Sequence, residues 1–405
     1  MKKIIAILCA LAMILSAASC MAEVAEAPEE INVPVIEEMK QFDIPDNEAL
    51  RFVREMKTGW NLGNTFDAFD DDGWFTDPEP MMEMAWHGMR TKRELMANLK
   101  EAGFNTIRIP VSWHNHVDEN YTIHPDWLAR VKEVVGWAVD EGLYVIVNVH
   151  HDNTPNKNNR YFYPDSAHYD QSAAYLGAIW QQMADAFAEF DEHVILESMN
   201  EPRLVGTNYE WNFVAGAEAC QDAAECINKL NQLFVDTVRA TGGNNATRYL
   251  LVPGYCAAPS GVTNKYFRMP EDTADNRIIL EVHAYTPYDF ALNKNGYSNF
   301  SLENKKRLSE VAGFMNKLYE NYVSQGIPVV IDEYGAMDKG NLQDRVNFVA
   351  YYLCAASARG ITCCWWDNGA FGGDGEIFGI INRSSGQWKY PEIVEAIMAN
   401  CTFNR

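Results

Sequence analysis

Two glutamates stand where the sequence could place acid and base chemistry. Glu201 lies in Asn-Glu-Pro and Glu333 in Asp-Glu-Tyr-Gly, and each closes a short apolar run of the kind that forms a buried strand. Cleavage of an acetal needs one carboxylic acid to protonate the leaving oxygen and one carboxylate to attack the carbon or activate water. Two strand-end glutamates would supply that pair.

Most other predicted strands also end in a residue that could serve a site. These residues are Arg108, His150, His151, Asp152, Asn200, His283, Tyr285 and Trp366. Each alone has an ordinary structural explanation, such as a turn, a buried ion pair or a core histidine. In a parallel barrel the carboxyl ends of all strands meet at one face, where active sites lie. Their joint placement at strand ends therefore predicts a functional site.

The elements that would position these residues alternate along the chain. Short β-branched runs lie at 58–62, 106–109, 143–149, 194–199, 249–252, 278–282, 329–331 and 361–366, and helix-like stretches at 91–102, 125–141, 171–190, 218–241, 302–324 and 341–359. Eight strands alternating with helices predict an α/β fold of the (β/α)8 TIM barrel type, with one catalytic domain over 46–405. A doubly wound sheet is the competitor, but the segment after the first run lacks the G-x-G-x-x-G spacing.

The first 19 residues predict an export signal. Lys2 and Lys3 precede an apolar run, and small residues follow up to Cys20,. The stretch before Cys20 resembles a lipoprotein processing box, which predicts a lipid anchor on Cys20; cleavage near Ala22 is the alternative. Residues 20–45 are acidic and proline-bearing, which predicts a flexible linker. The protein is expected outside the cell or on the cell surface, as an outer-membrane lipoprotein of a bacterium.

The net charge argues against one class of partner, and the cysteine spacing argues against a metal site. The formal net charge of −23 repels phosphate backbones, which argues against a nucleic-acid partner,. Apart from Cys9 and Cys20 in the export region, seven cysteines remain, an odd number whose spacing resembles no metal site, so buried free thiols are expected; a Cys220–Cys226 pair is the alternative,. We expect a monomer.

Seven motifs resemble glycoside hydrolase family 5, and most closely its subfamily 4 of endo-β-1,4-glucanases. They are GWNLGNTFDA (59–68), FNTIRIPVSW (104–113), VNVHHD (147–152), ESMNEPR (197–203), EVHAYTP (281–287), VVIDEYGA (329–336) and CWWDNG (364–369). They occur in the family's order from about residue 50 to the end. The resemblance implies a retaining hydrolase of β-1,4-linked glucans, with no metal and no organic cofactor.

The resemblance also assigns roles to residues. It makes Glu201 the acid/base and Glu333 the nucleophile, with Arg108, Asn200, His283 and Tyr285 completing the catalytic set. It places Asn64, His150, His151, Trp366 and Trp86 against the substrate. The segment MAWHGMRTKRE (84–94) departs from the subfamily's usual Ala-Trp-Gly-Asn-like stretch, which affects the contacts expected near Trp86.

The chemistry sets expectations for the two glutamates. Arg108 should face Glu333 and keep it ionised, and a Tyr285 hydroxyl should hold it. Burial and the nearby Glu333 charge should raise the pKa of Glu201, so that it starts as an acid. Asn200 should donate to a sugar 2-hydroxyl, and Trp366 should stack beneath the sugar.

Competing functions conflict with particular residues of the sequence. Adjacent strand residues such as His150 and His151 should point to opposite sides, which argues against their sharing a metal ion. A non-catalytic glycan-binding surface lipoprotein would lack a carboxylate, and both are present. An aldolase-type barrel would need a strand-end lysine, and the predicted strands have none. Cellulose or mixed-linkage glucan (lichenan) is the first expected substrate, xyloglucan the second and mannan the third.

Overall fold

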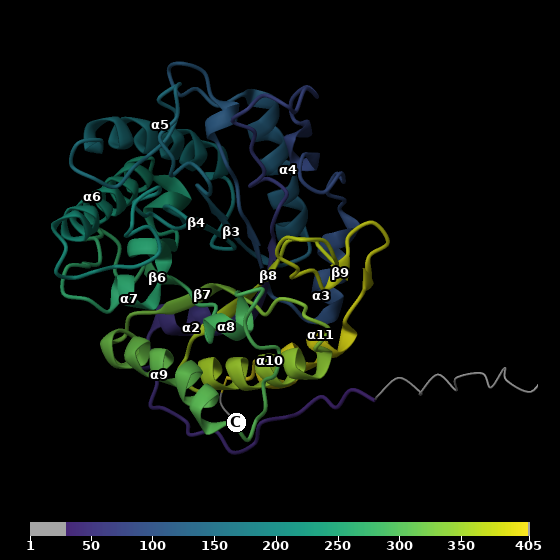
Figure 1. Ribbon diagram of the computed structural model, residues 1–405. Coiled ribbons are helices and arrows are strands. Elements are labelled where there is room, and N and C mark those ends of the chain that lie inside the picture. Colours follow the sequence, from purple (N-terminus) through teal and green to yellow (C-terminus); the bar gives the residue numbers. More distant parts are fainter. Residues whose placement is uncertain (1–29, 404–405) are drawn as a thin grey trace, which may run out of the picture. The chain divides into compact units, whose positions relative to one another are not determined.

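A computed structural model describes residues 30–403 of the chain. Its centre is a closed barrel of eight parallel strands (Figure 1). The strands are β1 (Thr58–Leu62), β2 (Thr106–Ile109), β3 (Tyr144–Asn148), β4 (Val194–Glu197), β5 (Leu250–Pro253), β6 (Ile278–His283), β7 (Val329–Tyr334) and β8 (Thr362–Asp367). Each strand pairs with its sequence neighbours, and β8 closes the ring on β1. The predicted (β/α)8 barrel is confirmed, with strand boundaries shifted by a few residues at most.

Helices surround the barrel, as their amphipathic sequences predict,. The long ones are α3 (Glu94–Ala102), α4 (Pro125–Asp140), α5 (Tyr169–Phe187), α6 (Glu218–Ala240), α9 (Lys305–Asn321), α10 (Leu342–Ser357) and α11 (Pro391–Asn400). Shorter pieces are α7 (Pro259–Val262) and α8 (Tyr288–Ala291), and a small hairpin pairs β9 (Ile381–Asn382) with β10 (Gln387–Trp388). The six predicted helices are present; α2, α7, α8, α11 and the hairpin were not predicted.

Helix α2 (Glu48–Met56) closes the amino-terminal end of the barrel. Its apolar face packs on strand residues, with Phe52 stacked on Tyr249 at 3.7 Å between ring centroids. Asn47 caps the helix by accepting a hydrogen bond from the Leu50 amide,. Because α2 fills this end, a site is expected at the opposite end, where the carboxyl ends of the strands lie.

Strands β6 and β7 carry irregularities where they approach the open end. The register shifts between Val282 and His283 on β6, and between Ile331 and Tyr334 on β7. Regular alternation would send Asp332 and Glu333 to opposite faces of the sheet. Both nevertheless face Arg108, at 3.4 Å and 2.6 Å, because a bulge re-aims side chains,.

The prediction of a flexible linker over residues 20–45 is wrong for residues 33–45. This segment packs on the barrel: Asn400 joins the Ile36 amide and the Pro34 carbonyl, and the Phe42 amide donates to the Ala358 carbonyl. The Arg359 guanidinium lies 4.3 Å from the Phe42 ring centroid. The acidic residues of the segment hid the apolar side chains at Ile36 and Phe42 that dock it. The predicted signal, Cys20 and the first part of the linker lie outside the described residues.

Two further observations concern membrane spans and thiols. Within residues 30–403, no helix is both long and apolar enough to span a bilayer. In this range Cys220, Cys226, Cys256, Cys363, Cys364 and Cys401 are free thiols, so Cys220 and Cys226 do not form a disulfide.

Candidate active site

Glu333 is held by two predicted partners at the open end of the barrel. Arg108, from β2, donates from Nη1 to Glu333 Oε1 at 2.6 Å, and the Tyr285 hydroxyl donates to Oε2 at 2.9 Å. Only 7% of the Glu333 side chain is exposed. The positive charge and the hydroxyl fix the carboxylate in one orientation, as a nucleophile requires.

Arg108 is fully buried and connects four strands. Its Nε and Nη2 each donate to Glu197 at 2.7 Å, and Nη2 also donates to Asn200 Oδ1 at 2.7 Å. Nη1 donates to Asn61 Oδ1 at 3.1 Å. Because the oxygen of the Asn200 amide faces Arg108, its NH2 end is directed elsewhere, as donation to a sugar hydroxyl would need. Glu197 and Asn61 were not predicted.

Glu201 meets Glu333 at a shared histidine. His283 Nδ1 lies 2.9 Å from Glu201 Oε1 and 3.5 Å from Glu333 Oε2. One carboxylate oxygen from each glutamate and a His283 ring nitrogen all lie within 4.8 Å of one another. Burial alone would lower the pKa of His283, but the charge of Glu333 and the hydrogen bond to Glu201 raise it well above its usual value. His283 is therefore an imidazolium that donates to Glu201.

The sequence predicted a raised pKa for Glu201, but the structure lowers it. Burial raises it, but the hydrogen bond and charge of His283, together with the charge of Arg203, outweigh burial and lower the pKa of Glu201 below its usual value. The prediction counted the negative neighbour Glu333 and overlooked the positive one.

A second pair of acids lies on the other side of the same imidazole. Glu281 Oε1 is 3.4 Å and Asp332 Oδ1 3.5 Å from His283 Nε2, and both side chains are fully buried. Their carboxylate oxygens accept no hydrogen bond from the described residues. Burial first, and then the negative charge of Glu197, raise the pKa of both acids well above their usual values. We call Glu281 and Asp332 the floor acids.

His150 and His151 lie together beside Trp366. The His150 ring stacks parallel to Trp366 at 5.9 Å, and the two histidine rings meet edge-on at 4.4 Å. Burial lowers the pKa of His150 well below its usual value, and burial followed by the charge of Arg203 lowers that of His151 to about 4, so both are neutral. Neutral imidazoles suit hydrogen bonding to hydroxyl groups.

His150 and His151 do not point to opposite sides, as the sequence pattern predicted that they would. Strand β3 ends at Asn148, so the alternation rule does not reach them. Each offers one nitrogen that lies, with an Asp67 oxygen, in a group spanning 4.8 Å. Asp67, however, already accepts hydrogen bonds from the Asn64 and Thr65 amides at 2.9 and 2.6 Å.

The remaining predicted contacts surround this side of the barrel mouth. Asn64 adopts a left-handed φ of 55° in the turn after β1. A Cβ on the preceding Gly63 would lie 2.8 Å from the Trp366 ring, so glycine is needed for the tryptophan to occupy its place. Trp86 is 37% exposed and packs against Phe69 and His151. The structure thus brings all eleven predicted site residues to the open end of the barrel.

The sequence contains a signal for the site residues that were not predicted. Glu197, Glu281 and Asp332 are acids inside otherwise apolar runs, and Asn61 is an amide in another. A charge in a buried strand requires a partner or a proton. That signal predicts a buried charge network, although the sequence alone does not say which strands face each other.

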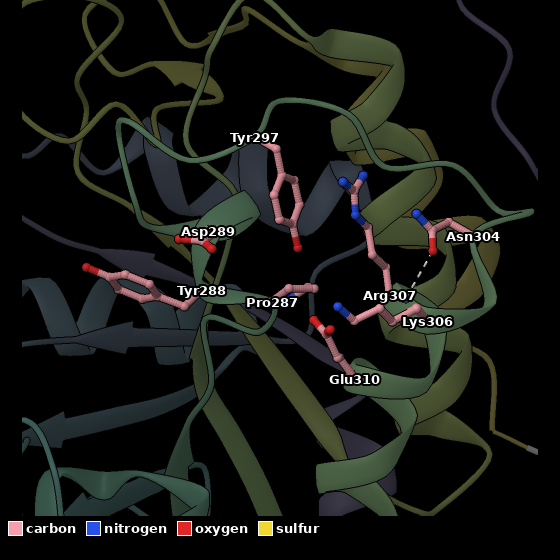
Figure 2. A pocket seen from close by; sticks show the side chains of 8 residues that line it. All are labelled: Pro287, Tyr288, Asp289, Tyr297, Asn304, Lys306, Arg307 and Glu310. Carbon is pink, nitrogen blue, oxygen red and sulfur yellow. Dashed lines mark hydrogen bonds between the residues drawn. The ribbon is translucent and has the colours of Figure 1, made fainter.

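A separate pocket of about 430 Å3 lies between the α8 loop and α9 (Figure 2). It is lined by Pro287, Tyr288, Asp289, Tyr297, Asn304, Lys306, Arg307 and Glu310. The Arg307 guanidinium covers the Tyr297 ring at 3.7 Å. None of the predicted site residues lines it, so this pocket is not the site described above.

Comparisons with known proteins agree with this geometry. The family model Cellulase (glycosyl hydrolase family 5) matches residues 71–372. Endoglucanase 1 of Ruminococcus albus is 39% identical over 374 residues, covering 92% of this chain and 86% of its own.

Two solved structures are also similar. A mutant of the glycoside hydrolase 5 lichenase from Caldicellulosiruptor sp. F32, in complex with cellotetraose, is 50% identical with a TM-score of 0.89, covering 92% of this chain and all of its own. A GH5-4 broad specificity endoglucanase from Ruminococcus champanellensis with bound cellotriose is 42% identical with a TM-score of 0.80, covering 88% and 100%. From the matched family model and the coverage of these relatives, this chain belongs to glycoside hydrolase family 5.

Proposed function

We propose that this protein is an endo-acting β-1,4-glucanase that hydrolyses internal bonds with retention of configuration. The observation that carries the proposal is the short separation of Glu201 and Glu333, whose nearest oxygens lie within 4.8 Å. Retaining glycosidases hold their two carboxyl groups about 5–5.5 Å apart, whereas inverting ones keep roughly 6.5–9.5 Å to admit a water.

In the first step, Glu333 attacks the anomeric carbon as the bond to the leaving oxygen breaks. Glu201 gives that oxygen a proton, which leaves a glycosyl ester on Glu333 and a free sugar hydroxyl. Asn200 is positioned to donate to the 2-hydroxyl, a contact that strengthens as the oxocarbenium-like state forms. Trp366 offers a ring beneath the sugar.

The proton for this step is held by a pair of residues. Because His283 donates to Glu201 across 2.9 Å, the imidazolium and carboxylate together carry one proton that can reside on either partner. We propose that a bound sugar, by excluding water from Glu201, shifts the proton from His283 Nδ1 to the carboxylate.

In the second step, Glu201 removes a proton from a water molecule, and that water cleaves the glycosyl ester. The sugar leaves with its original β configuration and Glu333 is again a carboxylate. Two inversions at one carbon give net retention.

Proton NMR of the first turnover tests this proposal. Hydrolysis of a cello-oligosaccharide should release the β-anomer before mutarotation, and Glu333→Ala should abolish it. Initial release of the α-anomer would overturn the retaining mechanism, and absence of any turnover on β-1,4-glucans would overturn the function.

Xyloglucan is the second candidate substrate. A GH5 xyloglucan-specific endo-β-1,4-glucanase from a metagenomic library, in complex with cellotriose, is 36% identical to this chain with a TM-score of 0.76. A reducing-sugar assay on carboxymethylcellulose, barley β-glucan, xyloglucan and glucomannan separates the candidates. We expect barley β-glucan and carboxymethylcellulose to be cleaved fastest.

We further propose that the protein is exported and anchored through a lipid on Cys20. This rests on the sequence pattern of residues 1–20 alone,. Cys20→Ala should move the protein from the membrane fraction to the soluble fraction. A wild-type protein that is already soluble in its native host would contradict the anchor.

A further inference from the structure

We propose that Arg203 is a positioning residue for the acid/base Glu201, and that the ion pair of Arg203 with Glu210 determines the alkaline limit of catalysis. The inference rests on the proposed function, because it needs Glu201 to be the residue that protonates the leaving oxygen. Arg203 follows Glu201 by two residues, in the segment between β4 and α6 that also carries Glu210. The three side chains form a row of alternating charge that leads away from the acid/base.

Arg203 holds the backbone of Glu201 and also faces its carboxylate. Its Nη1 donates to the Glu201 backbone oxygen at 3.0 Å and lies 3.7 Å from Glu201 Oε2. Only 17% of the Arg203 side chain and 18% of the Glu201 side chain are exposed. Because water screens the attraction between these two charges only in part, the guanidinium stabilises the ionised form of Glu201.

Glu210 offsets part of the Arg203 charge through a different nitrogen. Its Oε1 lies 3.5 Å from Arg203 Nε, and its Oε2 accepts a hydrogen bond from the Gly206 amide at 2.9 Å. Arg203 Nε is buried and donates no hydrogen bond within the described residues, so its contact with Glu210 is one of charge alone. The guanidinium also lies over the Trp211 ring, 4.1 Å from the centroid, which limits its movement,. The charge of Arg203 is therefore shared between Glu201 and Glu210.

Titratable groups from five other strands, or from the loops that follow them, also face Glu201. They are His151 after β3, Cys256 after β5, His283 and Tyr285 at the end of β6, Glu333 on β7 and Glu376 after β8. Burial raises the pKa of Cys256, Tyr285 and Glu376, and it lowers that of His151 to about 4. His283 shares its proton with Glu201, whereas an arginine stays charged at every pH at which proteins are stable. Compared with these groups, Arg203 therefore carries the fixed positive charge at the acid/base.

The arrangement of these charges gives the sign of the expected pH effect. His283 and Glu201 share one proton, and protonation of the leaving oxygen stops when the pair loses this proton at high pH. The loss leaves a net negative charge on the pair, which Arg203 stabilises and Glu210 destabilises. Without the charge of Arg203, the pair should keep its proton to higher pH. Without the charge of Glu210, it should lose the proton at lower pH.

The test is the pH dependence of kcat/KM on cellopentaose, whose leaving oxygen needs a proton. Arg203→Met should move the alkaline limb of the profile upward by about one pH unit, and Glu210→Gln should move it downward by about half a unit. Arg203→Lys keeps the charge and should leave the limb within about 0.3 units of that of wild type. Arg268→Met is the matched control, because it removes an exposed arginine that pairs with Glu225 on α6, and its profile should be that of wild type.

Shifts of the limb in the same direction for Arg203→Met and Glu210→Gln, or no shift in either, would overturn the inference. A loss of kcat/KM at every pH with an unmoved limb would mean that Arg203 only holds the backbone, which overturns its electrostatic role. If circular dichroism shows that Arg203→Met does not fold, the shift of the nearly isosteric Glu210→Gln decides the test. A wild-type protein that cleaves no β-1,4-glucan refutes the proposed function itself, before any variant is compared.

Discussion

The two carboxyl pairs around His283 have the same chemistry and different surroundings. At the barrel mouth, Glu201 and Glu333 are hydrogen-bonded to His283, Tyr285 and Arg108. One layer deeper, the floor acids Glu281 and Asp332 lie 3.4–3.5 Å from the other imidazole nitrogen, and none of their oxygens accepts a hydrogen bond from the described residues.

This difference shows that position relative to hydrogen-bond donors, more than residue type, decides which acids can be ionised. A buried carboxylate without donors is costly, so the floor acids retain their protons and the pKa of each is raised,. Glu201 and Glu333, by contrast, have hydrogen-bond donors and lie at the open end of the barrel. A glutamine has nearly the shape of a protonated glutamic acid and cannot ionise, so glutamine substitution at each layer tests the comparison directly.

Glu333→Gln should have the largest effect. The variant keeps the shape of the side chain but has no nucleophile, and kcat should fall by at least about four orders of magnitude. The measurement is initial-rate hydrolysis of β-glucan, with circular dichroism as the control for folding. Activity within a few-fold of wild type would mean that another group attacks the sugar.

Glu201→Ala should have the next largest effect, and only where the leaving group needs a proton. On β-glucan the rate should fall by about 10²- to 10⁴-fold. On an aryl cellobioside with an acidic phenol, the first step should survive and the glycosyl ester should accumulate. Added azide should then attack the ester and give the β-glycosyl azide, detectable by mass spectrometry and NMR. An α-azide, or no rescue, would contradict the assigned role.

Much of this arrangement could be predicted from the sequence, because the barrel concentrates strand-end residues at one face. The apolar runs located all eight strands, and the residues at their ends located the mouth of the site. The bulges in β6 and β7 could not be read this way, because a two-residue period gives no sign of an inserted residue. They bring Asp332 and Glu333 to the same side.

The charge state of Glu201 was also predicted wrongly from the sequence. It depends on the distance from Glu201 to His283, which belongs to another strand, and on the acids that keep that imidazole charged. Sequence separation gives no such distance. Residues 33–45 were missed for a related reason: their contacts, such as Ile36 with Asn400, join opposite ends of the chain.

Tyr285→Phe should have a smaller effect at the mouth. It removes the hydroxyl that donates to Glu333 Oε2 across 2.9 Å while leaving the ring against Phe378. A hydrogen bond to a charged group contributes about 1.5–3 kcal/mol, so kcat should fall by roughly one to two orders of magnitude. The measurement is kcat on an aryl cellobioside, where leaving-group protonation matters least. An unchanged kcat would mean that the hydroxyl does not support the nucleophile.

Glu281→Gln should have the smallest effect on turnover and a specific effect on stability. Because the wild-type acid is protonated in the fold, glutamine mimics it, and kcat near neutral pH should stay within a few-fold of wild type. If Glu281→Gln instead inactivates the enzyme as Glu333→Gln does, the floor acid is ionised and the comparison between the two layers fails. Asp332→Asn is the companion variant at the other floor position.

The pH dependence of the stability of Glu281→Gln tests the direction of the Glu281 pKa shift. The pKa of Glu281 is raised in the folded state above its ordinary value of 4.5, so above that pH the unfolded chain releases a proton that the folded chain keeps. Its contribution to stability is complete below about pH 4.5 and is lost as pH rises toward the folded pKa, by up to about 1.4 kcal/mol per pH unit. Glutamine cannot titrate, so the Tm of Glu281→Gln should fall less than that of wild type between about pH 5 and about pH 8 in calorimetry.

Glu281→Ala, which leaves a cavity in the barrel, should lower Tm at every pH and thereby separates lost packing from lost titration. Parallel Tm curves for wild type and Glu281→Gln would show that Glu281 is ionised in the fold and that His283 neutralises it.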